Sequence, residues 1–286
     1  SGSSEFTASG VGSERVKQFS KRWAKYYNEP RPSIHIHVDS LPPQHCGLGV
    51  GTQLGLSVAA ACQCARGIQG VSAVDWAASV GRAERSAIGT YGFLQGGLIA
   101  ERGRTPGERI SPLDVRCDLP TSWRFLLMRR PQNSAGLSGE GERKAFGTLP
   151  SVQPATRDKL IRLAQEGLIP GAIQADWTKF SESLYEYGHI AGSCYSAIQG
   201  GAYNGERVAE VVEFVRSIGL VGAGQSSWGP TVFAIAESES QAVDKMKEIH
   251  DRFGDIETVV SSPDNSGVQL VANQTDSTRV TASAPQ

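Results

Sequence analysis

The sequence PPQHCGLGVGTQLGLSVAAA, residues 42–61, places a glycine-rich loop directly before an apolar helix. Because Gly47, Gly49 and Gly51 alternate, the backbone can expose successive N–H groups in one concave turn. The start of the helix adds unpaired N–H groups and a partial positive charge. Together these features predict a site for a phosphate or a pyrophosphate. The alternative is a glycine-rich turn whose role is to pack the helix closely.

Two familiar phosphate-binding loops are excluded by the spacing of this segment. A Walker-type loop requires lysine after its last glycine, but Gly51 is followed by threonine and glutamine. A dinucleotide motif that starts at Gly49 would require glycine where Leu54 stands. It would also require a tight turn straight from the strand, whereas residues 39–46 intervene.

A second glycine-rich loop, within VGAGQSSWGPTVFAIAES at 221–238, joins a predicted helix to a predicted strand. Its glycines and serines offer backbone N–H groups and hydroxyls that can line a ligand from the opposite side. The alternative here is a simple connection between helix and strand. Two such loops in one chain favour a ligand site over two unrelated turns.

The rest of the chain predicts an α+β fold. Helical periodicity indicates helices over 14–27, 52–66, 156–166, 176–196, 206–218 and 239–253. Strands are predicted over 33–38, 123–128, 231–236 and 256–260, and residues 93–100 are partly strand-like. The helix and strand order of the last third indicates an open α+β sandwich whose sheet is covered on one side.

Composition narrows the class of function. A net charge of −1 gives no basic excess for a nucleic-acid partner, and no apolar run approaches the ~20 residues that a membrane helix needs. The five cysteines are odd in number and form no CxxC pair, which indicates free thiols in a reducing compartment. We therefore expect a cytoplasmic protein that binds small molecules, with no nucleic acid and no membrane.

Four motifs in order resemble one family. GLGVGTQLGLSVA at 47–59 resembles the GLGSGTQLALAVA segment of β-ribofuranosylaminobenzene 5′-phosphate synthases, which are non-kinase members of the GHMP kinase superfamily. GRAERSAIGTYGFLQGGLIAERGR at 81–104 resembles their RGxxSGIGxxxFxxGGFIVDGG segment. The segment 123–146 resembles their strand and GxSGxxE loop, and the loop at 221–230 resembles the late GAGxSSxGPTxFA loop of the superfamily.

The resemblance implies a GHMP kinase-like α+β fold. Its N-terminal domain, like domain 2 of ribosomal protein S5, would cover 1–150. A ferredoxin-like C-terminal domain would cover 151–271, and 272–286 would be a disordered tail. The family begins with a β-hairpin region that precedes Ser1 here, so we expect the list of site residues to be incomplete.

The resemblance favours a synthase over an ATP-dependent small-molecule kinase of the same superfamily. Such kinases carry a catalytic aspartate in a Gly-Ser-Gly-x-Asp setting, but the comparable residues 86–91, SAIGTY, contain no acid. Phosphoryl transfer thereby loses a recurring part of its machinery. Departures from the synthase pattern are Val50 for serine, Ala87 for glycine and Ala100-Glu101 for Val-Asp. A binding protein that kept the pocket without catalysis is the third hypothesis.

The reaction that the family implies is a decarboxylating condensation in tetrahydromethanopterin biosynthesis. Phosphoribosyl pyrophosphate loses pyrophosphate at C1, the ring carbon of 4-aminobenzoate that bears the carboxylate attacks, and CO2 leaves. The enzyme is thus a glycosyltransferase of the pentosyltransferase type, and family precedent is a homodimer. Backbone N–H groups and a Mg²⁺ ion suit the leaving pyrophosphate.

The predicted site residues fall into two groups. Those expected to hold pyrophosphate, to line the sugar cleft or to close its far wall are Gly47, Gly49, Gly51, Thr52, Gln53, Gly89, Gly96, Gly97, Gly224, Ser226, Ser227 and Gly229. Those expected to act in catalysis are Ser86, Arg82 and Glu140.

Several of these predictions compete with plainer interpretations. Arg82 and Arg104 suit a phosphate or a carboxylate, and each is equally well a solvated surface arginine. Glu140 is a candidate Mg²⁺ ligand or base, with an ordinary loop acid as the alternative. His35 and His37 share a strand face, but with no third ligand nearby a solvent-facing strand is favoured over a metal pair, so no metal-ligating residues are predicted.

Overall fold

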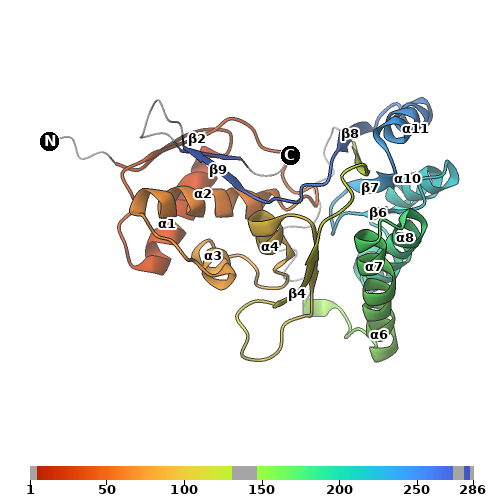
Figure 1. The fold of residues 1–286 in the computed structure, drawn as a ribbon, viewed down its shortest axis with the longest axis horizontal. Coiled ribbons are helices and arrows are strands. Elements are labelled where there is room, and N and C mark those ends of the chain that lie inside the picture. The colour runs from red at the N-terminus through yellow and green to blue at the C-terminus, as the bar shows by residue number, and fades with distance from the viewer. Residues whose placement is uncertain (1–4, 131–146, 273–279, 284–286) are drawn as a thin grey trace. The chain divides into compact units, whose positions relative to one another are not determined.

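The computed structural model describes residues 5–130, 147–272 and 280–283 (Figure 1). Contacts divide the chain into two units. Unit 1 comprises Ser1–Pro43, Gly49–Arg116 and Asp264–Gln286, and unit 2 comprises Gln44–Leu48 and Cys117–Pro263. This division differs from the predicted boundary at residue 150. Residues 117–130 belong to unit 2, and the chain returns to unit 1 after residue 263.

Unit 1 is a group of helices flanked by short strand pairs. Its helices are α1 (Ser13–Tyr27), α2 (Val50–Arg66), α3 (Ala73–Ser79) and α4 (Ile88–Gln95). Its strands are β1 (Thr7–Gly10), β2 (His35–Val38), β3 (Leu98–Glu101), β4 (Leu113–Cys117, with its last residue in unit 2), β9 (Gln269–Ala272) and β10 (Val280–Ser283). β1 pairs parallel with β2, β9 pairs antiparallel with β10, and β3 pairs with β4.

The core of unit 1 lies between α1 and α2. Val16, Phe19 and Trp23 follow a helical period on α1 and are buried, so the predicted helix over 14–27 is confirmed. They share one apolar cluster with buried residues of α2 such as Leu54 and Val58. This packing fixes the start of α2 beside α1, which matters for the site below.

Unit 2 is a four-stranded antiparallel sheet with helices. Its strands are β5 (Arg124–Arg129), β6 (Ala223–Gln225), β7 (Val232–Ala236) and β8 (Glu257–Ser261), in the order β6-β7-β5-β8. Its helices are α6 (Pro154–Arg162), η1 (Leu163–Leu168, a π-helix), α7 (Ile169–Ile173), α8 (Trp177–Ser193), α9 (Ser196–Gln199), α10 (Glu206–Ser217) and α11 (Glu239–Arg252).

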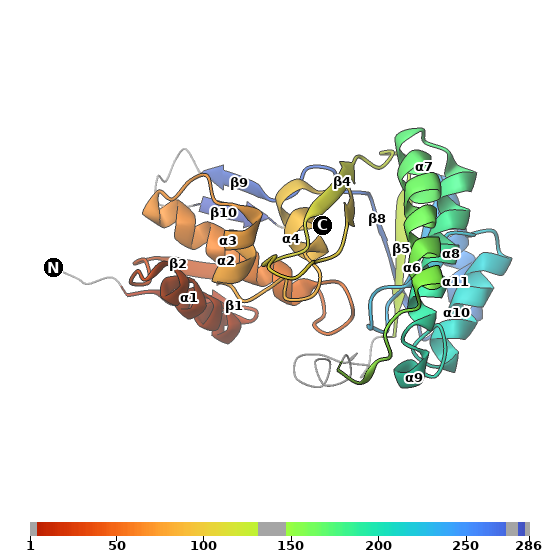
Figure 2. The same ribbon diagram turned by 90° about the horizontal axis from the view of Figure 1, so that it is seen from below.

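The helices of unit 2 cover one side of its sheet, as the sequence predicts (Figure 2). Leu126 and Met128 of β5 are buried and share a core with Val215 of α10 and Ile249 of α11. Alternate residues of a strand point to opposite faces, so this face packs on the helices. On the edge strand β8, Val259 is 56% exposed.

Three segments differ from their predictions. The prediction that 93–100 is partly strand-like is confirmed where β3 begins at Leu98, whereas its first residues belong to α4, which extends to Gln95. Burial of Phe93 in the core of unit 1 stabilises this glycine-rich helix against its weak local propensity. Strand β6 lies within the predicted loop 221–230, and β10 within the predicted disordered tail. In the part of the chain that the structure describes, no helix has the length and apolar character to cross a membrane.

Candidate functional site

Helix α2 begins inside the first glycine-rich loop. Gly49 occupies the N-cap position with φ 68° and ψ 12°, a left-handed conformation that favours glycine. Its carbonyl accepts hydrogen bonds from the N–H groups of Thr52 (2.8 Å) and Gln53 (3.1 Å). Because glycine has no side chain, the N-cap position contributes no capping oxygen to the first turn. The start of α2 therefore has the character of an anion-binding helix terminus.

Two arginines gather at the first turn of α2. A Cβ built on Gly51 would lie 2.7 Å from Nη2 of Arg15 and 3.0 Å from Nη2 of Arg82. Both guanidinium groups lie over the ring of Phe19, 5.9 Å and 5.4 Å from its centroid. The structure thus places the predicted Arg82 beside the predicted Gly51. Sequence reasoning missed Arg15, because its place beside Gly51 depends on how α1 packs on α2.

Thr52, Gln53 and Gly89 are brought together where α2 meets α4. The side chain of Gln53 donates from Nε2 to the carbonyl of Gly89 at 3.3 Å. A Cβ on Gly89 would lie 3.3 Å from Cγ2 of Thr52, so the two residues are packed closely. Within the described residues, Oε1 of Gln53 is buried and accepts no hydrogen bond. These predicted residues form one polar cluster next to the first turn of α2.

An acidic side chain lies at the start of α4. The carboxylate of Glu101, from β3, accepts a hydrogen bond from the N–H of Ala87 at 2.7 Å. The predicted catalytic Ser86 is the neighbouring residue, and its Oγ accepts from the N–H of Ile88 at 3.3 Å. The segment 86–91 contains no acid of its own, yet β3 supplies one there. The signal was present in the sequence, since Glu101 stands where the resembling family has aspartate.

Gly96 and Gly97 contact the chain's own backbone. Gly96 has φ 61° and ψ −168°, and a Cβ there would lie 2.6 Å from the carbonyl oxygen of Asp264. The N–H of Gly97 donates to that same oxygen at 2.6 Å. This turn accounts for the two glycines without a ligand, and their predicted role in the sugar cleft stays a prediction.

In unit 2, the start of the first glycine loop packs on the second. Ser226 Oγ donates to the carbonyl of Gly47 at 3.0 Å. Gly47 has φ 89°, and a Cβ there would overlap the carbonyl oxygen of Ser226. A Cβ on Gly229 would in turn overlap the carbonyl group of Cys46. The two loops therefore meet backbone to backbone, at a distance that only glycine permits.

The remaining predicted residues of unit 2 are part of this packing. Gly224 lies in β6, and a Cβ there would lie 3.0 Å from the ring of Phe233. Ser227 has φ 54°, and its carbonyl accepts from Nε2 of Gln225 at 2.8 Å. These contacts shape the second loop from within unit 2.

The predicted residues thus form two groups, because the first loop passes from unit 2 to unit 1 between Leu48 and Gly49. Unit 1 holds Gly49, Gly51, Thr52, Gln53, Arg82, Ser86, Gly89, Gly96 and Gly97. Unit 2 holds Gly47, Gly224, Ser226, Ser227 and Gly229. Glu140 lies outside the described residues.

The next question is whether side chains that can bind a metal ion lie close together. Among the residues with described positions, no three His, Cys, Asp or Glu side chains gather as a metal site. His35 and His37 instead share the hydroxyl of Ser9, at 2.8 Å and 2.7 Å. His35 also contacts the hydroxyl of Thr7 at 2.7 Å, as expected for the outer face of a paired strand.

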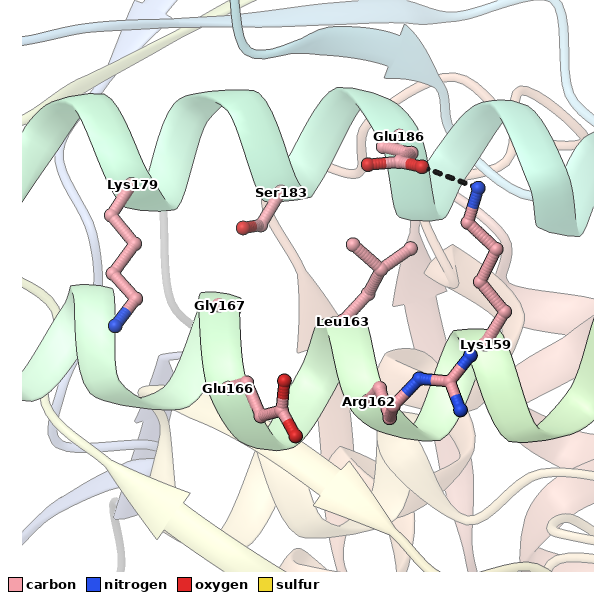
Figure 3. Close-up of a pocket in the computed structure, with 8 residues that line it drawn as sticks. All are labelled: Lys159, Arg162, Leu163, Glu166, Gly167, Lys179, Ser183 and Glu186. Carbon is pink, nitrogen blue, oxygen red and sulfur yellow. Dashed lines mark ion pairs between the residues drawn. The ribbon is translucent and has the colours of Figure 1, made fainter.

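A pocket of about 310 Å³ lies elsewhere in unit 2, between α8 and the helical segment of α6 and η1 (Figure 3). Its lining includes the ion pair between Lys159 and Glu186 (2.6 Å), and η1 approaches α8 closely where Gly167 meets Ser183. None of the predicted site residues lines this pocket. Its charges of both signs give it no clear preference for a phosphate.

Comparison with known proteins fits this geometry. Residues 168–254 match the family model of the GHMP kinases C terminal domain. The solved homoserine kinase from Cytophaga hutchinsonii superposes with a TM-score of 0.61 at 15% identity, over 93% of this chain and 85% of that one. The chain therefore has the GHMP kinase-like α+β fold that the sequence motifs predict.

Two curated proteins with a more specific name align with most of this chain. The β-ribofuranosylphenol 5′-phosphate synthase of Methanothermobacter thermautotrophicus is 26% identical over 82% of this chain and 75% of its own. The enzyme of the same name from Archaeoglobus fulgidus is 26% identical over 91% of this chain and 82% of its own. The predicted resemblance to this type of synthase is confirmed, and the chain is a related enzyme.

Proposed function

We propose that the chain joins the ribose of phosphoribosyl pyrophosphate to an aromatic ring. The acceptor is a para-substituted benzoate, either 4-aminobenzoate or its close analogue 4-hydroxybenzoate. The bond between C1 and pyrophosphate breaks, a bond from C1 to the ring carbon forms, and the carboxylate leaves that carbon as CO2. The products are a ribosyl-aryl 5′-phosphate, CO2 and pyrophosphate, which makes the enzyme a pentosyltransferase. The relatives' name, which contains a ribofuranosylphenol 5′-phosphate, supports this class of product.

The observation that carries the proposal is the cationic first turn of α2. Nη2 atoms of Arg15 and Arg82 both lie within 3.0 Å of one point above Gly51. Two guanidinium groups at a helix N-terminus suit a group with more than one negative charge. Phosphoribosyl pyrophosphate carries such charge at both of its ends, whereas the benzoate carries one carboxylate.

The start of α4 offers groups for the reacting sugar. As C1 loses pyrophosphate, positive charge develops on the ribose, and a carboxylate such as that of Glu101 stabilises such charge. Ser86, beside it, can donate a hydrogen bond to a sugar hydroxyl or a phosphate oxygen. We add Glu101 to the predicted catalytic residues Ser86 and Arg82, which belong to the same unit, and Glu140 stays a prediction.

Magnesium fits this site as a companion of the substrate. Mg²⁺ is usually held by substrate phosphate oxygens together with one or two carboxylates, and a pyrophosphate bound at α2 would supply such oxygens. When bound, it would neutralise charge on the leaving pyrophosphate.

A kinase of the same fold is less well supported. The relatives that share most of the chain's length are named as synthases. The kinase hypothesis predicts ATP consumption in the presence of a sugar or polyol acceptor.

The direct test is a decarboxylation assay. The protein would be incubated with phosphoribosyl pyrophosphate, Mg²⁺ and carboxyl-labelled 4-aminobenzoate or 4-hydroxybenzoate, and released CO2 and pyrophosphate would be measured. We expect equal amounts of both products with one of the acceptors, and none when phosphoribosyl pyrophosphate is omitted. A folded sample that releases neither product with either acceptor would rule out the proposed reaction.

A further inference from the structure

Helix α2 carries two glycines on its face toward α1. Gly51 and Gly55 are one turn apart, and glycine within a helix costs roughly 1 kcal/mol relative to alanine. A Cβ at Gly55 would lie 3.0 Å from the ring of Phe19. A Cβ at Gly51 would meet the guanidinium groups of Arg15 and Arg82. Glycine therefore lowers the intrinsic stability of α2 at the two positions where Phe19 and the two arginines approach the helix.

Phe19 serves as a platform for cations. Three guanidinium groups lie over its ring, those of Arg82 at 5.4 Å, Arg22 at 5.7 Å and Arg15 at 5.9 Å from the centroid. The face of an aromatic ring attracts a guanidinium cation within about 6 Å of its centroid, which favours these positions over Phe19. Arg82 also has its backbone tied to the end of α3, since its N–H donates to the carbonyl of Ala77 at 2.8 Å.

The three arginines differ in where their charged ends lie. Arg15 and Arg82 both extend to the first turn of α2, at Gly51. Arg22 instead donates from Nη1 to the carbonyl of Val80 at 3.4 Å. Two of the three cations are therefore converged on one point of the anion-binding turn, and the third is not.

We propose that Arg15 and Arg82 form a clamp for a terminal phosphate group, with Phe19 as its platform and Gly51 as its floor. Each guanidinium can donate two parallel hydrogen bonds to phosphate oxygens, and the N-terminus of α2 adds backbone N–H groups. A dianion placed between the two guanidinium groups is attracted by both of them. The clamp deepens the proposed function, because phosphoribosyl pyrophosphate supplies such groups at its pyrophosphate and at its 5′-phosphate.

The test measures binding without turnover. Calorimetric titrations of the full chain would use pyrophosphate, ribose 5-phosphate and 4-aminobenzoate as separate probes. We expect Arg15→Gln and Arg82→Gln each to weaken binding of one phosphate probe at least tenfold. The probe that loses affinity identifies which end of the substrate the clamp holds. Arg22→Gln, which removes a cation from the same ring, is the matched control and is expected to change affinity less than twofold.

Three results would overturn the clamp: unchanged phosphate affinity of Arg15→Gln, an equal loss in Arg22→Gln, or a loss confined to 4-aminobenzoate. If Arg15→Gln does not fold, Gly51→Ala tests the same point, since alanine favours the helix while its methyl group displaces the arginine ends. Phosphate affinity unchanged in Gly51→Ala would then count against the clamp. A clamp confirmed in a protein that releases no CO2 would leave the clamp standing and refute the proposed reaction.

Discussion

Gly47 and Gly49 are two residues apart in one loop and have opposite surroundings. Both have positive φ, 89° and 68°. A Cβ on Gly47 would overlap the carbonyl oxygen of Ser226, whereas a Cβ on Gly49 would meet no described atom within 4 Å. The fold of unit 2 therefore requires the first glycine, and the second leaves open space at the start of α2. A single glycine-rich motif thus combines a structural position with a position that a ligand can occupy.

The largest effect is expected when a methyl group is added at Gly47, the glycine that the fold of unit 2 requires. We expect Gly47→Ala to lower the free energy of unfolding by about 3 kcal/mol, because the methyl group would overlap the backbone of Ser226 and the left-handed conformation adds strain. Chemical denaturation would measure the loss. Gly49→Ala is the matched control, with strain of about 1 kcal/mol and no overlap. Equal losses in the two variants would contradict the distinction.

In unit 1, the contribution of Glu101 to catalysis can be separated from its contribution to stability. Glu101→Gln retains an oxygen that can accept from the N–H of Ala87, so stability should change by less than about 1 kcal/mol. Loss of the negative charge should lower kcat about 100-fold in the decarboxylation assay. Glu101→Asp, which keeps the charge, should recover part of the rate. Full activity in Glu101→Gln would assign this residue to capping of α4 without a catalytic role.

A smaller effect is expected when a side chain fills the open space at Gly49. Asparagine tolerates the left-handed region, so Gly49→Asn should retain stability within about 1 kcal/mol while its side chain enters the space next to the first turn. Pyrophosphate affinity should fall about tenfold, measured by calorimetry. Gly49→Val would lose binding and also incur backbone strain, which is why asparagine is the cleaner variant. Undiminished affinity in Gly49→Asn would separate this loop from the anion site.

The smallest expected effect is on the alkylation rates of two buried cysteines. Both are already present in the chain, so no reporter thiol has to be introduced. Cys46 belongs to unit 2 and Cys62 to α2 of unit 1, and burial raises the pKa of the Cys62 thiol to about 12. At pH 8 only about one thiol in 10,000 at Cys62 would be ionised, so exposed Cys64 should be alkylated far earlier. In Gly47→Ala, labelling of Cys46 should accelerate more than that of Cys62. Equal acceleration would show that the two units open together.

Much of the fold was predictable because its strongest signals are periodic. The helix over 14–27 shows its apolar face as Val16, Phe19 and Trp23, and these residues are buried in the structure. The buried strand over 123–128 is likewise present as β5. Helix α4 was not predicted, because a segment with four glycines in 88–97 has weak propensity and owes its helix to the burial of Phe93.

The site was predictable in part, for a related reason. Glycine spacing identified Gly51, Thr52 and Gln53 at the first turn of α2, because loop and helix are adjacent in sequence. Arg15 and Glu101 reach this region and the start of α4 from other elements. Their placement depends on how α1 and β3 pack. For Glu101 the family resemblance offered a signal, because it stands where the family has aspartate, whereas no pattern in the sequence points to Arg15.

The return of the chain to unit 1 has a consequence during protein synthesis. The carbonyl of Asp264 accepts from Gly97, and the N–H of Val268 donates to the carbonyl of Phe93 at 2.7 Å. These contacts close the end of α4, yet they come from a segment that the ribosome delivers after all of unit 2. At translation rates of about 5–20 residues per second, unit 1 would wait roughly 7–30 seconds between Arg116 and Asp264 for its last segment. Unit 2, although later in the chain, can complete its own sheet first, and a nascent unit 1 is the part that a chaperone would have to protect.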